Sequence, residues 1–151
     1  MRELQIIAND IRSAENVGSI FRTCDSLGVS KLWIAGYTPT PEHPRVEKTA
    51  LGAERSVPWE QVTDVVTVIA RLREEGFRIV GLERDKNAVN LLQYVPQEKT
   101  ALLLGNEVTG IPPSLIGECD DVVEISQQGM KESLNVSVAA GVAAYWILNA
   151  R

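Results

Sequence analysis

The chain has few of the residue types that build metal sites and disulfide frameworks. Among its 151 residues are two cysteines and one histidine, His43, which lies in a proline-rich segment. Cys24 and Cys119 have no CxxC or Cys/His neighbour, so we expect buried free thiols. A zinc site or a Ser-His-Asp triad needs more ligating or basic side chains than these. The sequence therefore predicts chemistry without a metal or a histidine.

Long apolar runs and an excess of positive charge are also lacking. No apolar run approaches the roughly 20 residues that cross a bilayer, and residues 1–7 resemble a first strand rather than a signal peptide. We therefore expect a cytoplasmic protein with no membrane partner. A net charge of −5 argues against a protein that coats nucleic acid non-specifically. Arg45, Lys48 and Arg55 could still form a locally basic surface around one loop.

Apolar runs and helical signals alternate along the whole chain. The apolar runs predict strands at 4–8, 31–36, 77–83, 100–105 and 121–125. Helical spacing or capping signals predict helices at 13–28, 46–51, 61–75, 112–116 and 134–150. This alternation is typical of an α/β fold with an open parallel sheet and helices on both faces. With no internal repeat or linker, residues 1–151 are expected to form a single domain.

The closing helix predicts a partner subunit. Its residues are apolar on nearly every face, and a helix of that kind must be buried all round. In a small domain the sheet covers only one side of it. We therefore expect a second copy of the chain to cover the other side, which makes a homodimer the favoured assembly.

A first group of polar residues, Asn16, Gly18 and Arg22, lies in the first predicted helix. Gly18 inside a helix costs about 1 kcal/mol relative to alanine, so we expect it to permit a close backbone approach. Arg22 could be a functional cation or a surface ion-pair partner of Glu15 or Asp25. Taken alone, the ion pair is the favoured interpretation.

Two further groups follow apolar strands, where ligand sites of parallel sheets are built. Glu107, in the Gly105–Asn106–Glu107 segment, could be a functional carboxylate or a cap for exposed backbone amides. Ser133 is a predicted N-cap of the closing helix. Asn135 and Ser137 would then enter a buried helix, where unpaired polar groups are costly. They need partners, which a ligand or a catalytic loop would supply. No GxGxxG, GxxxxGK[ST] or GxSxG motif is present, so the common phosphate loops and the nucleophile elbow are unsupported.

Taken in order, these groups resemble the three motifs of the SpoU (TrmH-like) family of SPOUT RNA methyltransferases. The resembling segments are Asn16-x-Gly18-x-x-x-Arg22, Leu103-Leu104-Gly105-Asn106-Glu107-x-x-Gly110, and Ile125 to Ala139 with its Ser133-Leu134-Asn135 centre. Residues 48–54, KTALGAE, are also similar. The resemblance implies a 2′-O-ribose methyltransferase that uses S-adenosyl-L-methionine (AdoMet). It also implies a C-terminal trefoil knot and a dimer with its sites at the interface.

The resemblance also implies roles for individual residues. The residues implied in cofactor binding are Leu82, Gly105, Asn106, Ile125, Gly129, Met130, Ser133 and Leu134. The residues implied in catalysis are Arg22, Asn16, Glu107, Ser133 and Asn135. We expect Arg22 to bind the phosphate beside the target and polarise the 2′-hydroxyl, because a guanidinium with a pKa above about 12 is a poor base.

The substrate and the activity are less sharply defined than the family. The chain shows no added RNA-binding domain, which favours a compact tRNA target over an rRNA site. The alternatives are an rRNA 2′-O-methyltransferase and a non-catalytic RNA-binding module on the same fold. Finding Arg22, Glu107, Ser133 and Asn135 together favours the enzyme. The third motif departs from many relatives at Ser126–Gln127, where they have Pro-Met, so cofactor affinity or loop rigidity could differ.

Overall fold

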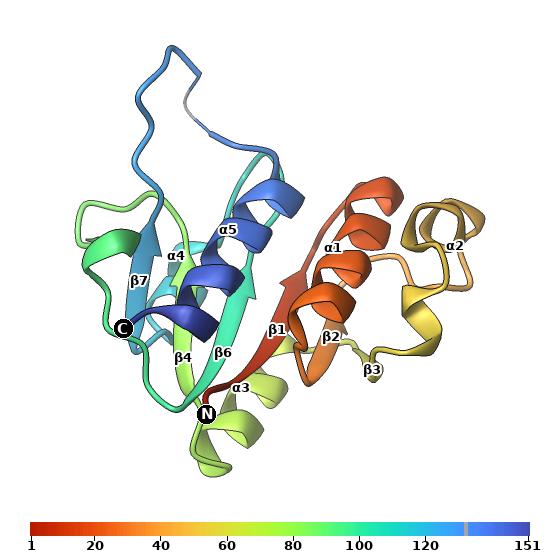
Figure 1. Ribbon diagram of the computed structural model, residues 1–151, viewed down its shortest axis with the longest axis horizontal. Helices are drawn as coiled ribbons and strands as arrows, with labels where there is room; N and C mark the ends of the chain where they lie inside the picture. Colours follow the sequence, from red (N-terminus) through yellow and green to blue (C-terminus); the bar gives the residue numbers. More distant parts are fainter. Residues whose placement is uncertain (132) are drawn as a thin grey trace.

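A parallel sheet forms the centre of the molecule. The computed structural model describes residues 1–131 and 133–151, and in these ranges seven strands pair in the order β3-β2-β1-β6-β4-β7-β5 (Figure 1). Every strand pair is parallel. The strands are β1 (Glu3–Asn9), β2 (Lys31–Ala35), β3 (Trp59–Val62), β4 (Arg78–Leu82), β5 (Val89–Asn90), β6 (Lys99–Leu104) and β7 (Asp121–Glu124). The predicted open parallel sheet is confirmed.

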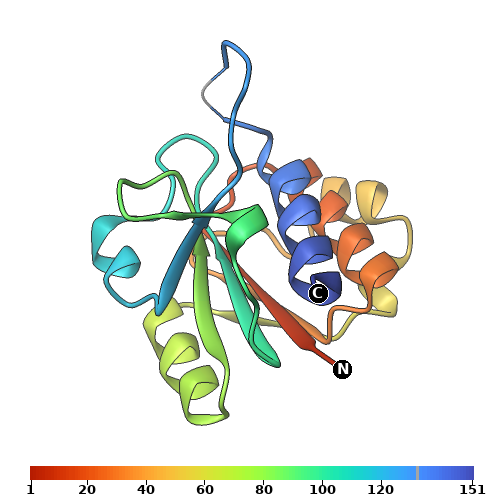
Figure 2. The same cartoon turned by 60° about the vertical axis from the view of Figure 1, so that its left-hand side comes forward.

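Helices cover both faces of this sheet, as expected (Figure 2). On one face lie α1 (Ala14–Leu27), α2 (Pro44–Ala50) and α5 (Val136–Asn149), and on the other lie α3 (Val65–Glu74) and α4 (Pro113–Ile116). Two short 3-10 turns, η1 (Ala53–Arg55) and η2 (Leu91–Gln93), complete the described elements. Neighbouring residues of β6 pack on opposite faces of the sheet, because side chains alternate along a strand. Leu102 packs toward α1 and α5, and Leu103 packs toward α3.

Local signals set both ends of α1. The Ser13 side chain accepts a hydrogen bond from the Asn16 amide, and Gly28 ends the helix in a left-handed conformation with φ 73°. The buried positions between them follow helical spacing and include Cys24. Gly18 permits the predicted close approach, since a Cβ there would overlap Thr49 Oγ1 of α2.

The expected helix 61–75 is wrong at its start. Residues Trp59–Val62 form β3, which pairs with β2 from Leu32 to Ala35, and Asp64 then N-caps α3. Pairing with β2 satisfies the backbone groups of this segment, and Trp59 packs edge-on against Phe21 at 6.4 Å between ring centroids. These partners lie far away in the sequence, so helical spacing alone could not reveal them.

The closing helix also begins differently from the prediction. Asn135, and not Ser133, is its N-cap, and the helix starts at Val136. A single copy buries it on one side only, through Ala140, Ala143, Ala144 and Ile147. Exposed apolar side chains lie on the remainder: Val138, Val142 and Tyr145. The expectation of burial all round is therefore not met within one chain.

The C-terminal half has an unusual strand order. β4 and β5 follow each other in sequence, yet β7 lies between them. The connection from 83 to 88 therefore passes the end of β7, where the Glu83 amide donates to the Val123 carbonyl at 3.0 Å. The trefoil knot itself stays a prediction. Across the described ranges, no helix is long and apolar enough to cross a membrane.

Candidate active site

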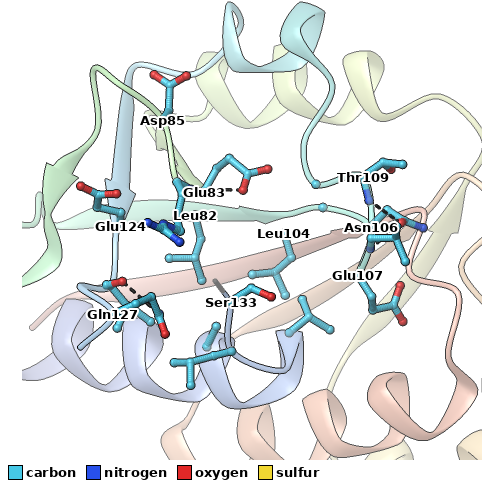
Figure 3. Close-up of a pocket in the computed structure, with 18 of the residues that line it drawn as sticks. Leu82, Glu83, Asp85, Leu104, Asn106, Glu107, Thr109, Glu124, Gln127 and Ser133 are labelled. Carbon is cyan, nitrogen blue, oxygen red and sulfur yellow. Dashed lines mark hydrogen bonds between the residues drawn. The ribbon is translucent and has the colours of Figure 1, made fainter. Parts of the chain in front are cut away.

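A cavity of about 730 Å³ lies at the carboxyl ends of β4, β6 and β7, beside the start of α5 (Figure 3). Ligand sites of open α/β sheets occupy this edge. Six of the predicted cofactor residues line it: Leu82, Gly105, Asn106, Ile125, Ser133 and Leu134. Gly129 and Met130 lie outside this lining, on an exposed loop where the Met130 side chain is fully open to solvent.

The loop after β6 forms one wall of the cavity by folding back on itself. Asn106 and Gly110 exchange two backbone hydrogen bonds of 3.3 and 2.9 Å. The Asn106 side-chain oxygen also accepts from the amides of Val108 and Thr109. A Cβ on Gly105 would lie 2.5 Å from the Gly110 carbonyl carbon. The chain thus makes a tight turn between Asn106 and Gly110, and this turn leaves no room for a side chain at Gly105.

A carboxylate that the sequence reasoning missed closes the opposite end of the loop. Glu83 accepts a hydrogen bond of 2.7 Å from the Ile111 amide. It also lies where a Cβ on Gly110, at φ 70°, would overlap its oxygen. Asp85 and Glu124 add further carboxylates to the lining. Its position in the sequence could have indicated it, because Glu83 directly follows the buried strand β4. Glu107 similarly lies soon after the end of β6.

Glu107 joins the loop after β6 to the start of α1. Its two carboxylate oxygens accept hydrogen bonds from the amides of Arg12 and Ser13, both at 2.8 Å, and from Asn16 Nδ2 at 3.1 Å. Partial burial raises the pKa of Glu107, but the bonds from the two amides and from Asn16 outweigh it, so the net pKa lies below its ordinary value. Glu107 therefore does cap exposed backbone amides, and it stays charged.

The charge on Glu107 orients a chain of amide side chains. A carboxylate only accepts, so Asn16 must turn its Nδ2 toward Glu107 and its oxygen away. That oxygen accepts from Asn135 Nδ2 at 3.1 Å. The Asn135 oxygen is then free to cap α5, accepting from the amides of Ser137 at 2.9 Å and Val138 at 3.4 Å. The expectation that Asn135 and Ser137 are buried is wrong, because Asn135 is exposed and Ser137 is half-buried. Their polar groups are paired with Asn16 and with each other.

Ser126 and Gln127, where the third motif departs from the common pattern, both make hydrogen bonds. Ser126 Oγ accepts a hydrogen bond of 2.6 Å from Asn90 Nδ2 of β5. Gln127 donates to the Ile125 carbonyl at 3.1 Å and lines the cavity. The first bond ties the segment to β5 at the edge of the sheet, and the second closes a turn within the segment itself.

Arg22 lies apart from the cavity of its own chain. The interpretation as a surface ion-pair partner is wrong, because Glu15 pairs with Arg45 at 3.6 Å and Asp25 accepts from Ser56 Oγ at 2.7 Å. No salt bridge of Arg22 is found in the described part of the chain. It lines a second groove, between α1 and α5. The apolar side chains of that groove include Leu92, Val138, Val142, Tyr145 and Trp146.

Acidic and thiol side chains do not gather into a metal centre. Within residues 1–131 and 133–151, no group of three or more His, Cys, Asp or Glu side chains is placed to hold a metal ion. Cys24 is buried and Cys119 is half-buried, and both are free.

Comparison with known proteins identifies relatives along nearly the whole chain. The SpoU rRNA Methylase family matches residues 3–145. A tRNA (guanosine(18)-2′-O)-methyltransferase of Aquifex aeolicus is 31% identical over 145 residues, which are 95% of this chain and 68% of that protein. A 23S rRNA (guanosine-2′-O-)-methyltransferase of Acinetobacter baylyi is 30% identical, covering 94% and 58%. A tRNA (guanosine(18)-2′-O)-methyltransferase of Saccharomyces cerevisiae is 32% identical over 95% of this chain, which spans only 10% of that protein.

Solved structures show the same arrangement. The tRNA modifying enzyme TrmH/SpoU of A. aeolicus superposes with a TM-score of 0.88 at 30% identity, covering 98% of this chain and 75% of that one. The SpoU methyltransferase AviRb from Streptomyces viridochromogenes, in complex with AdoMet, gives a TM-score of 0.86 at 27% identity, covering 97% and 59%.

Proposed function

The chain belongs to the SpoU rRNA Methylase family, and on this premise we propose that it methylates a ribose 2′-hydroxyl of RNA with AdoMet. One observation carries the proposal. The hydrogen-bond chain through Glu107, Asn16 and Asn135 joins one residue from each of the three motifs beside the cavity. Residues from three distant parts of the sequence thus converge on one place, as the parts of an active site do.

The cavity suits AdoMet in size and in chemistry. Its volume of about 730 Å³ falls within the roughly 300–1,000 Å³ of small-molecule sites. Apolar Leu82, Leu104 and Ile125 offer a surface for the adenosine part. The carboxylates of Glu83, Asp85 and Glu124 complement a cofactor that carries positive charge on sulfur and nitrogen. A relative, AviRb, is known in complex with AdoMet.

The reaction forms a bond between the ribose 2′-oxygen and the methyl carbon. The carbon–sulfur bond breaks with its electron pair on sulfur, and the hydroxyl proton passes to solvent. AdoMet supplies an activated methyl group, so the chain has mainly to align the reactants. Alignment is worth about 7–11 kcal/mol in favourable cases. Glu107 already accepts three hydrogen bonds, so we assign it, with Asn16 and Asn135, to positioning.

A second copy of the chain would complete the site. Arg22 does not line the cavity of its own chain, but it lines a groove with the exposed apolar side chains of Val138, Val142 and Tyr145. Pairing of two such faces would bury them and bring Arg22 of one copy toward the cavity of the other. There Arg22 would bind the substrate phosphate and polarise the 2′-hydroxyl.

The dimer is tested by a charge placed in this face. Val142→Glu should give a monomer by light scattering and lose methyl transfer, because a buried unpaired carboxylate is costly. Val66→Glu is the matched control, since Val66 is similarly exposed on α3 at the opposite face of the sheet. A Val142→Glu monomer with full activity would show that Arg22 does not act across an interface.

We favour tRNA as the substrate. The relative of which this chain spans the larger share, from A. aeolicus, is named for tRNA guanosine 18, and the yeast relative carries the same name. The rRNA enzyme of A. baylyi is the reason to keep 23S rRNA as the second candidate. The ribose of guanosine 18 is accordingly the first position to examine.

The decisive experiment incubates the protein with methyl-labelled AdoMet and either total tRNA or total rRNA, then maps the labelled ribose. We expect label on a 2′-oxygen of tRNA. Label in rRNA alone would overturn the choice of tRNA, and label on a base would overturn the reaction. AdoMet binding without transfer to either RNA would favour the non-catalytic RNA-binding module.

A conservative variant tests the role of Arg22. Arg22→Lys keeps the charge but loses the bidentate fork that matches a phosphate. We expect kcat/KM for RNA to fall at least about tenfold, the effect of about 1.4 kcal/mol, with AdoMet affinity unchanged. Nearly full turnover would show that guanidinium geometry is irrelevant.

A further inference from the structure

Tyr37 places an exposed aromatic ring beside the cavity. It lies two residues after β2, at the same edge of the sheet as the cavity, and is 62% exposed. Its hydroxyl accepts a hydrogen bond of 2.8 Å from Asn106 Nδ2, and Asn106 lines the cavity. The ring is therefore fastened to the cavity wall while most of its surface faces solvent.

The backbone around Tyr37 is held on both sides. The Tyr37 amide donates to Asp10 Oδ1 at 3.1 Å. The next residue, Thr38, is buried; its hydroxyl donates to the Ala8 carbonyl at 3.1 Å and accepts from the Ile11 amide at 2.9 Å. An aromatic side chain presented by a fixed backbone loses little conformational entropy when a ligand covers it. Tyr37 is thus prepared for contact before any ligand arrives.

The surroundings of the ring match an RNA nucleotide. In the part of the chain that the structure describes, neither an aromatic ring nor a cation covers Tyr37. Unpaired RNA bases stack on such free aromatic faces. Arg12 is exposed, and although it lies 25 positions before Tyr37 in the sequence, its amide donates to Glu107 Oε1 at 2.8 Å, next to the residue that binds Tyr37. The Tyr37 hydroxyl thus contacts Asn106 and the Arg12 backbone contacts Glu107, so the same wall carries an aromatic ring and an exposed arginine, whose guanidinium group suits a phosphate.

We propose that Tyr37 is the platform on which a base of the RNA substrate stacks, holding its nucleotide beside the cavity. The proposal rests on the proposed function, because it assigns this surface to the RNA that receives the methyl group. Tyr37 would act on RNA binding and not on AdoMet binding. Stacking tolerates all four bases, since every base has a flat face, so the platform positions the nucleotide without reading its identity.

Three variants test the platform. Tyr37→Ala removes the ring, Tyr37→Phe keeps the ring but removes the acceptor for Asn106, and Val66→Ala is a surface control on α3. The dissociation constant for unfractionated tRNA and for total rRNA is measured by filter binding, and that for AdoMet by calorimetry. KM and kcat are measured on the RNA that the wild type methylates. We expect Tyr37→Ala to raise the RNA dissociation constant and KM about ten- to hundredfold. Tyr37→Phe and Val66→Ala should stay within about threefold, and AdoMet affinity should not change.

Distinct results would overturn the platform and the proposed function. Unchanged RNA binding in Tyr37→Ala overturns the platform. So does an equal loss of AdoMet and RNA affinity, which would mean that Tyr37 only supports the Asn106 wall. A wild-type protein that binds RNA but transfers no methyl group overturns the proposed function, while the RNA dissociation constant of Tyr37→Ala still decides on the platform. A wild type that binds no RNA overturns both.

Discussion

Replacing Glu107 by glutamine is the most direct test of the hydrogen-bond chain that joins the three motifs. One carboxylate oxygen accepts from the Arg12 amide, and the other accepts from the Ser13 amide and Asn16 Nδ2. Glutamine has one oxygen and one NH₂ group, and the NH₂ cannot accept. Its best orientation turns the oxygen toward Ser13 and Asn16 and leaves the Arg12 amide facing a donor.

The magnitude follows from these three bonds. A hydrogen bond to a charged group contributes about 1.5–3 kcal/mol, and one between neutral groups about 0.5–1.5 kcal/mol. Glu107→Gln loses one charged bond and weakens two. The Arg12 amide is exposed and can turn to water, so losing its bond costs little. The two weakened bonds fall from about 1.5 to about 0.5 kcal/mol each, and we therefore expect the free energy of unfolding to fall by about 2 kcal/mol. For a chain of this size that corresponds to a Tm lower by about 4–8 °C.

The assay is thermal unfolding followed by circular dichroism, with Glu98→Gln as the matched control. Glu98→Gln removes the same charge as Glu107→Gln. The Glu98 side chain is exposed, however, and has no hydrogen-bond partner in the described residues. The control should therefore unfold within about 1 °C of the wild type, as surface changes of under about 0.5 kcal/mol do. Equal Tm values for the two variants would refute the reasoning.

The pH dependence gives an independent check. The folded pKa of Glu107 lies below its ordinary value of 4.5, so its contribution to stability is complete above that value. The contribution is lost as the pH falls through the folded pKa. The difference in Tm between wild type and Glu107→Gln should accordingly be smaller at pH 3 than at pH 7. A difference independent of pH would mean that the charge is not its cause.

Two further predictions concern packing and thiol reactivity. Gly18→Ala should lower the free energy of unfolding, measured by urea denaturation, by about 1–3 kcal/mol. The reason is that the new Cβ would overlap Thr49 Oγ1 and lie 2.9 Å from the Ala50 amide nitrogen. A more stable variant would contradict the close approach of α1 and α2. Burial raises the pKa of Cys24 to about 12 and that of Cys119 to about 11, so both thiols should react slowly with a disulfide reagent at pH 8, since thiolate is the reactive form. Cys119, the less buried, should react first, and immediate modification of Cys24 in the native protein would contradict its burial.

Elements with strong local signals were predictable, and those set by distant partners were not. Ser13 and Gly28 bound α1 as expected, because N-caps and left-handed C-caps act within one turn of the chain. The segment Trp59–Val62 was assigned partly to a helix because its pairing partner, β2, lies more than twenty residues earlier. Asn135 displaced Ser133 as the N-cap of α5. Serine and asparagine are both good N-cap residues, so the local sequence does not decide which of the two begins the helix.

In the candidate site, too, local sequence and tertiary structure decide different features. The sequence alone determined the family motifs, the residue types in them and the alternation of strands and helices. Tertiary structure decided which of those residues touch. Glu107 and Asn16 lie 91 positions apart, and Asn16 and Asn135 lie 119 apart, yet each pair meets at 3.1 Å. Arg22, only six positions after Asn16, faces a different groove. The physical reason is that apolar spacing reports which face of an element is buried, whereas side-chain contacts depend on strand order and helix packing, which bring together residues that no local pattern relates.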